Sequence, residues 1–173
     1  MFEQNYITSA VKQFTQYKNL GEKAMNQVPD DTLYWQYNPE SNSMAMIVKH
    51  LAGNMLSRFT DFLTSDGEKS WRNRDAEFEN EEITRDELMA LWEKGWNCLF
   101  DALKNLSPED LSGKILIRKE EHTVMEAINR QLTHYAYHVG QIVFVGKMTS
   151  DSNWKSLSIP KRASREFNSK KGL

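Results

Sequence analysis

The chain contains a single cysteine, Cys98, so no internal disulfide can form. This scarcity fits a reducing compartment and excludes a metal cluster built from thiolates. The sequence also lacks any run of about 18 apolar residues, and no basic segment precedes an apolar stretch at its N-terminus. We therefore expect a cytoplasmic protein that neither spans a membrane nor is secreted, in which any metal site uses nitrogen and oxygen ligands.

Familiar catalytic motifs are missing as well. No Ser-His-Asp order, glycine-rich phosphate loop or paired-carboxylate motif stands out in the sequence. Cys98 is interpreted as a small core residue rather than a nucleophile. The sequence alone therefore leaves the catalytic residues unknown.

Composition and charge favour one domain with a basic end. With 39% hydrophobic residues in 173 positions, a single domain can bury most of its apolar surface. The net charge is −2, but residues 151–173 carry six Lys or Arg against two acidic residues, which makes this segment basic and the rest acidic. We predict a bundle over residues 1–150 and a basic tail over 151–173 that packs on the bundle or extends from it. Nucleic-acid binding through the tail is the least favoured reading, because its basic residues are scattered.

Helical periodicity runs through four long segments. Apolar residues recur at three- and four-residue steps in segments that span residues 5–27, 43–63, 84–103 and 123–147. Ser43 is a good N-cap, and Thr84 and Thr123 each begin a capping box. These features predict an all-α fold, a four-helix bundle in which each helix exceeds 20 residues, with long connecting loops and an irregular C-terminal tail. A short extended piece could form near residues 114–118.

Three of the four histidines could meet inside such a bundle. His134 and His138 are four residues apart, which stacks their side chains on one helix face about 6 Å apart at Cβ. His50 lies on the second predicted helix. Three neutral imidazoles on one divalent ion would leave an open coordination position, as in catalytic sites. The alternative is three polar residues at the edge of the core, each hydrogen-bonded to backbone or solvent. His122 is interpreted as a surface or capping residue.

Two amides lie where they could orient these imidazoles. Asn54 follows His50 by one helical turn, and Gln141 follows His138 by nearly one turn. Amide oxygens accept hydrogen bonds from the free ring nitrogen of a metal-bound histidine. Either amide could equally be a solvated polar residue.

These motifs together resemble those of the DinB superfamily. The resemblance covers nearly the whole chain and rests on Tyr34-Trp35, on the Ile-Val-Lys-His-Leu-Ala run of residues 47–52, and on the Leu-Thr-His-Tyr-Ala-Tyr-His-Val-Gly-Gln-Ile run of residues 132–142. The segment from Trp154 to Pro160, followed by Phe167-Asn168, is similar to a bacterial branch of that superfamily with no assigned reaction. The resemblance implies a four-helix bundle with one divalent metal bound by His50, His134 and His138.

The resemblance also implies a function, a cofactor and a partner. It favours a metal-dependent enzyme acting on a small molecule, either a thiol-dependent transferase using a low-molecular-weight thiol or a hydrolase, and it implies a homodimer. Zinc or nickel is the first choice of metal, with iron, copper, cobalt or manganese as alternatives. The competing reading is a non-catalytic dimeric bundle, stress-related or binding a small ligand, with a structural metal or none. Neither reading involves a membrane.

Overall fold

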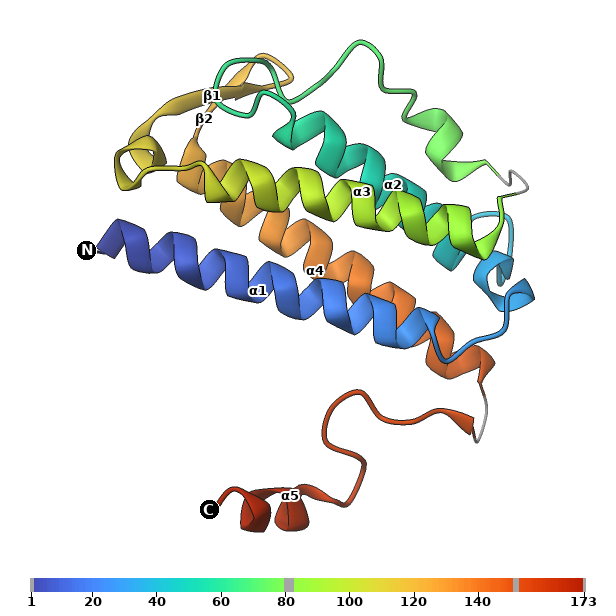
Figure 1. Cartoon of the computed structure of the whole chain (residues 1–173). Helices are drawn as coiled ribbons and strands as arrows, with labels where there is room; N and C mark the ends of the chain where they lie inside the picture. The colour runs from blue at the N-terminus through green and yellow to red at the C-terminus, as the bar shows by residue number, and fades with distance from the viewer. Residues whose placement is uncertain (1, 80–82, 151–152, 173) are drawn as a thin grey trace.

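The computed structural model describes residues 2–79, 83–150 and 153–172, and the statements below concern these ranges. Four long helices lie side by side, and a two-stranded hairpin lies at one end of them (Figure 1). The elements are α1 (Phe2–Met25), α2 (Met44–Phe59), α3 (Arg85–Lys104), α4 (Val124–Thr149), α5 (Ser164–Lys170), β1 (Lys114–Ile117) and β2 (Glu120–Thr123). Three 3-10 helices interrupt the connections, namely η1 (Asp31–Tyr34), η2 (Asp75–Phe78) and η3 (Pro108–Ser112). The predicted all-α bundle is confirmed.

Side-chain caps fix where three of the helices begin. Ser43 accepts a hydrogen bond from the backbone N–H three residues later, at 3.2 Å, at the start of α2. Thr84 and Thr123 do the same for α3 and α4, and Glu87 and Glu126 accept in return from the threonine backbone N–H groups at 2.9 and 2.7 Å. Each capping box satisfies two backbone donors that the helix leaves free. The predicted N-caps are therefore confirmed.

An aromatic core lies between α1, α3 and α4. Phe14, Trp92, Trp96 and Tyr135 are almost completely excluded from solvent. The Phe14 ring centroid lies 6.3 Å from that of Trp96 and 5.8 Å from that of Tyr135. Such aromatic pairs contribute about 0.5–1.5 kcal/mol beyond the burial of their area. This packing fixes the rotation of α4 and so determines which of its faces points towards α2.

The connection between α2 and α3 runs back along the length of the bundle (Figure 1). As a result α2 and α3 point the same way, unlike sequential helices joined by a short loop. Their backbones approach closely, since a Cβ on Gly95 of α3 would lie 2.9 Å from the Ala52 Cα of α2. The long connection carries η2 along α2, which brings a loop segment beside the middle of that helix.

One helix is shorter than the sequence predicted. α2 has 16 residues and ends at Phe59 rather than near Leu63. Thr60 is extended, with φ −68° and ψ 125°, and Asp61 has a positive φ of 49°. Side chains in the last turn of α2 donate hydrogen bonds to the Gly67 carbonyl, which holds the following loop against the helix end. The expectation of more than 20 residues is therefore wrong for α2, and α3, with 20 residues, falls just short of it.

The C-terminal tail begins in contact with the bundle. Residues 151, 152 and 173 of the predicted tail lie outside the described part of the chain. The Trp154 indole packs on Gly146 of α4, where a Cβ would come within 2.8 Å of the ring. Gln27, two residues after the end of α1, binds the backbone N–H and carbonyl of Lys155 at 2.7 and 3.2 Å. Farther on, the tail forms the short helix α5, so it is not irregular throughout as predicted. The whole of α5 is exposed to solvent.

Candidate metal centre

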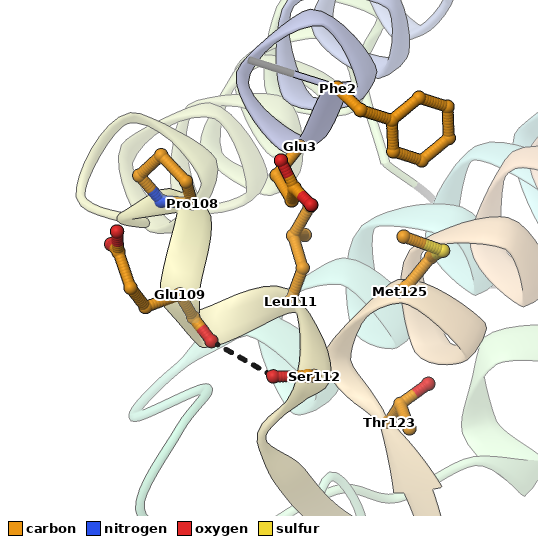
Figure 2. A pocket seen from close by; sticks show the side chains of 8 residues that line it. All are labelled: Phe2, Glu3, Pro108, Glu109, Leu111, Ser112, Thr123 and Met125. Carbon is orange, nitrogen blue, oxygen red and sulfur yellow. Dashed lines mark hydrogen bonds between the residues drawn. The ribbon is translucent and has the colours of Figure 1, made fainter.

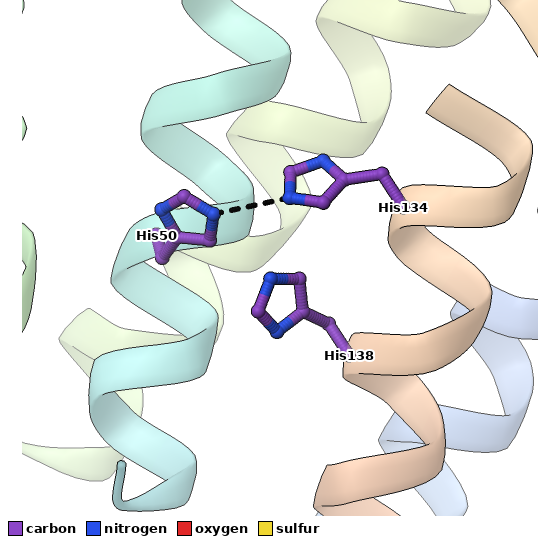
Figure 3. A group of neighbouring side chains, drawn as sticks. All are labelled: His50, His134 and His138. Carbon is purple, nitrogen blue, oxygen red and sulfur yellow. Dashed lines mark hydrogen bonds between the residues drawn. The ribbon is translucent and has the colours of Figure 1, made fainter. Parts of the chain in front are cut away.

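The three predicted ligands come from the middle of two facing helices. His50 lies on α2, and His134 and His138 lie one turn apart on α4 (Figure 3). On α4, Tyr135 and Val139 are fully buried in the core. Residues one position earlier lie about 100° around the helix. The packing of the apolar face therefore directs the two histidines towards α2.

The three imidazoles are close enough to share one ion. His50 Nε2 and His134 Nε2 are 3.2 Å apart. One ring nitrogen from each histidine lies within 4.8 Å of the other two. Two nitrogen ligands at the usual 2.0–2.1 Å from a tetrahedral zinc ion lie about 3.3 Å from each other. The cluster could therefore hold a single metal ion.

Each imidazole also has its Nδ1 beside an oxygen acceptor. The pairs are His50 with Glu77 at 2.9 Å, His138 with Gln141 at 2.9 Å, and His134 with Gln131 at 3.3 Å. Carboxylate and amide oxygens accept hydrogen bonds, so Nδ1 carries the proton and donates in each pair. Nε2 then keeps its lone pair. This is the tautomer in which Nε2 can ligate a metal while an outer acceptor fixes the ring.

The Nε2 atoms lack the partners that buried polar atoms normally have. His138 Nε2 is buried and has no hydrogen-bond partner within the described ranges. With both Nδ1 atoms protonated, no hydrogen lies between the Nε2 lone pairs of His50 and His134. An unsatisfied buried acceptor costs about 1–3 kcal/mol. One shared cation would satisfy all three atoms, so the donor set fits a divalent metal with a preference for imidazole.

The two α4 histidines are uncharged at neutral pH. Burial is the main cause that lowers the pKa of His134 to about 3, and the neighbouring His138 and His50 contribute to the same shift. Burial and His50 lower the pKa of His138 to about 4, although its hydrogen bond with Gln141 acts in the opposite direction. Neutral imidazole is the form that binds metals. The two α4 histidines therefore need not lose a side-chain proton before they bind an ion.

Glu77 is a part of the site that sequence reasoning missed. It lies on η2, is buried, and accepts from His50 and, at 2.7 and 2.8 Å, from Arg72. Burial alone would raise the pKa of Glu77, but the hydrogen bonds from His50 and Arg72 outweigh it and lower the pKa. Gly53 leaves room for this carboxylate, because a Cβ at Gly53 would collide with it. The loop carries no periodic pattern that could have revealed the contact.

The two amides singled out in the sequence lie in different surroundings. Gln141 binds His138 through its side chain. Asn54 is buried beside the same cavity as His50, and its Oδ1 accepts a hydrogen bond from the Tyr135 hydroxyl at 2.9 Å. Gln131 binds His134 instead and was not predicted. Its position three residues before His134, on the same face of α4, was the available signal.

Two other reactive residues, Cys98 and His122, and one further cavity lie apart from the histidine cluster. Burial raises the pKa of the Cys98 thiol, which fits a core role. His122 lies on β2 and is not part of the cluster. One cavity, of about 670 Å³, lies by the start of α1 (Figure 2). Its described lining includes Phe2, Leu111 and Met125 but no histidine, cysteine or arginine. The three-histidine cluster is therefore the stronger candidate site.

The whole sequence was then compared with known proteins. Residues 1–163 match the family described as "Protein of unknown function (DUF1572)". The chain belongs to the DUF1572 family. Comparisons with curated proteins and with solved structures give no match. In the described ranges of this DUF1572 protein, no helix combines the length and apolar character needed to cross a membrane.

Proposed function

We propose that this DUF1572 protein is a metal-dependent enzyme that acts on a small molecule at one divalent ion held by His50, His134 and His138. The observation that carries the proposal is the convergence of three Nε2 atoms, each left with its lone pair by the hydrogen bond at Nδ1. Apolar side chains would fill this space without the cost of buried polar atoms. Buried polar atoms that remain without partners therefore indicate a role in ligand binding rather than in stability.

The resemblance to the DinB superfamily supports the same conclusion. It implies metal binding by histidines on the second and last long helices, and these are α2 and α4 here. It also implies either transfer involving a low-molecular-weight thiol or hydrolysis. Thiol transfer and hydrolysis both need a metal that keeps a coordination position open.

The residues of this chain have separate roles in the proposal. His50, His134 and His138 ligate through Nε2, while Glu77, Gln131 and Gln141 hold the rings in the ligating tautomer. When bound, the ion supplies Lewis acidity, which lowers the pKa of a bound water or stabilises a thiolate. Zinc and nickel are the first metals to test, since imidazole suits both.

The first test is the metal content of the untagged protein. We expect close to one equivalent of a divalent metal per chain by mass spectrometry, and little in His134→Ala. His122→Ala removes a histidine outside the cluster and should keep the parent's content. A parent protein that stays metal-free after incubation with zinc, nickel or manganese would contradict the proposal.

A second test separates a catalytic ion from a structural one. Cobalt can replace zinc at nitrogen sites and reports its ligands through visible absorption. An open position should let a small thiol bind and add a thiolate-to-cobalt band. A spectrum that does not change with thiol or with competing anions would indicate a closed site, and would favour the non-catalytic bundle.

A further inference from the structure

A second cavity, of about 230 Å³, opens directly beside the histidines and is lined by arginines. Its charged lining consists of Arg58, Arg72, Arg74, Arg118 and Arg130, next to His50 and His134. We propose that this arginine pocket binds a small anion through a carboxylate or phosphate group. The further inference that this anion is the charged group of the substrate rests on the metal-dependent function proposed above.

The arginines of the pocket outnumber the carboxylates around them. Glu77 pairs with Arg72, and Glu68 is shared between Arg58 and Arg118. Asp66 lies near Arg58 as well, but it already accepts three backbone N–H groups. Within the described ranges, the five guanidinium groups thus face three carboxylates, those of Glu77, Glu68 and Asp66. A pocket with this excess of positive charge attracts anions and favours planar oxyanions that guanidinium groups bind through two hydrogen bonds.

Arg58 is the deepest of the five and is not fully satisfied. It is 5% exposed, and its Nε is buried with no hydrogen-bond partner within the described ranges. Its Nη1 donates to the Gly67 carbonyl, while Glu68 lies at 3.3 Å from both terminal nitrogens. Burial is also the main reason that the pKa of Arg58 is lowered. A buried cation with a spare N–H donor gains from an anionic partner.

The hairpin turn places Arg118 at the pocket in an unfavourable backbone conformation. Arg118 and Lys119 both have positive φ, 54° and 65°, which costs energy for residues other than glycine. Asp66 compensates by accepting the backbone N–H groups of both residues at 2.8 Å. These same backbone bonds lower the pKa of Asp66, together with one from Glu68 that contributes most. The turn thus holds one cation at the mouth of the pocket.

Arg74 and Arg130 complete the pocket and form no ion pair in the described structure. Arg74 lies over the Phe78 ring at 5.1 Å, and that ring lies 5.0 Å from the His50 imidazole. Arg130 is one helical turn before His134 on α4 and is exposed. Tyr137 belongs to the same lining, and its side chain carries a hydroxyl group that can donate a hydrogen bond. These groups are available to a ligand without breaking an existing ion pair.

The position of the pocket suits a substrate that is anchored at one end. His50 and His134 line it, so an anion held by the arginines would lie beside the proposed ion. The cavity, of about 230 Å³, has the volume of roughly eight liquid water molecules at about 30 Å³ each. This space suits a small carboxylate or phosphate group.

Calorimetric titration with defined anions tests the proposal. Sodium malonate, inorganic phosphate and neutral malonamide would be titrated into metal-free and zinc-loaded protein at low ionic strength, because salt weakens such contacts. We expect malonate or phosphate to bind both forms and malonamide to bind neither. The anion that binds more tightly identifies carboxylate or phosphate as the preferred group.

Variants of the pocket give the second comparison. Arg130→Ala and Arg74→Ala should each weaken binding about tenfold. Arg165→Ala, which removes the same charge from exposed α5, should have no effect.

The outcomes distinguish this pocket from the metal site. Anion binding that is absent from both forms of the parent would overturn the pocket while leaving the metal content untouched. Binding that requires zinc and ignores Arg74 and Arg130 would also overturn it, because the ion alone would then capture the anion. Anion binding by a protein that takes up no metal would support the pocket and reject the metalloenzyme. Circular dichroism of each variant checks that it remains folded.

Discussion

The apolar core between α1, α3 and α4 and the histidine seam between α2 and α4, formed by His50, His134 and His138, share one helix. The two regions differ in which of their buried polar atoms lack hydrogen-bond partners. In the core, the Tyr135 hydroxyl donates to Asn54, and the Trp92 indole N–H donates to Glu22. The Trp96 indole N–H has no partner within the described ranges, but it is a donor and cannot ligate a cation.

In the histidine seam, the atoms without partners have complementary chemistry. His138 Nε2 is an acceptor suited to a metal, and Arg58 Nε, a few residues along α2 from His50, is a donor suited to an anion. The core therefore presents no free acceptor that a cation could bind within the described ranges, whereas the seam does. This difference implies that stability and ligand binding can be changed separately, and the following predictions test that separation.

The largest effect should come from truncating the core. Phe14→Ala removes a fully buried ring that contacts Trp96 and Tyr135, and should lower the free energy of unfolding by about 3–5 kcal/mol. The histidine seam lies on another face of α4, so metal per folded chain should stay as in the parent. Urea denaturation and mass spectrometry measure the two quantities. Loss of metal from protein that is still folded would show that the regions are coupled.

Metal binding should produce the next largest effect. At a zinc concentration 100 times the dissociation constant, a folded-state site raises the free energy of unfolding by about 2.7 kcal/mol. We expect this increase in the parent and in His122→Ala, and none in His50→Ala. Thermal unfolding with and without a chelator measures it. An equal increase in His50→Ala would place the zinc elsewhere.

The two regions also differ in how well the sequence predicted them. The core followed from apolar periodicity, because Ile7, Phe14, Leu88, Leu99 and Ile142 are all buried where the pattern placed them. Capping boxes located the starts of α3 and α4 because their chemistry is local. The end of α2 could not be predicted from the apolar periodicity, because it depends on a loop that is hydrogen-bonded back to the helix.

The histidine seam was predictable only in its helical parts. The spacing of His134 and His138 and the place of His50 pointed to a shared site, and the structure brings them together. Glu77 and Arg118 reach the site from a crossover and a hairpin turn. Their positions depend on contacts between distant segments, such as Asp66 with Arg118, which no local pattern encodes.

Acidification should lower the free energy of unfolding of the metal-free protein through the histidines of the seam. The pKa is about 3 for His134 and about 4 for His138 in the folded protein, against 6.5 for an ordinary histidine. Between these values the unfolded chain binds protons that the folded chain does not. Stability should therefore fall as the pH drops from about 6.5 towards 4, by at most about 1.4 kcal/mol per pH unit for each histidine, and stay level above 6.5.

Urea denaturation of chelator-treated protein over this pH range measures the effect. The double variant His134→Gln, His138→Gln removes both titrating groups and should show a flatter dependence. Parallel curves for parent and variant would mean that other groups control the acid sensitivity.

The finest comparison uses two glycines beside the site. Gly53→Ala would push the Glu77 carboxylate away from its place beside α2, where it holds the His50 ring. Loss of such an outer hydrogen bond typically lowers metal affinity about 10–100-fold. Gly140→Ala, on α4 next to Val139, adds a Cβ that meets nothing within 4 Å. It should leave affinity unchanged and raise the free energy of unfolding by about 0.5–1 kcal/mol.

Competition with a chromophoric chelator measures affinity, and urea denaturation of the metal-free proteins measures stability. Because both changes add one methyl group to a helix, general helix effects act equally in the two variants. A specific role for Glu77 predicts that affinity falls in Gly53→Ala alone. Equal affinities would mean that the Glu77 carboxylate moves without consequence for His50, and that the ring is held by its packing against Phe78 instead.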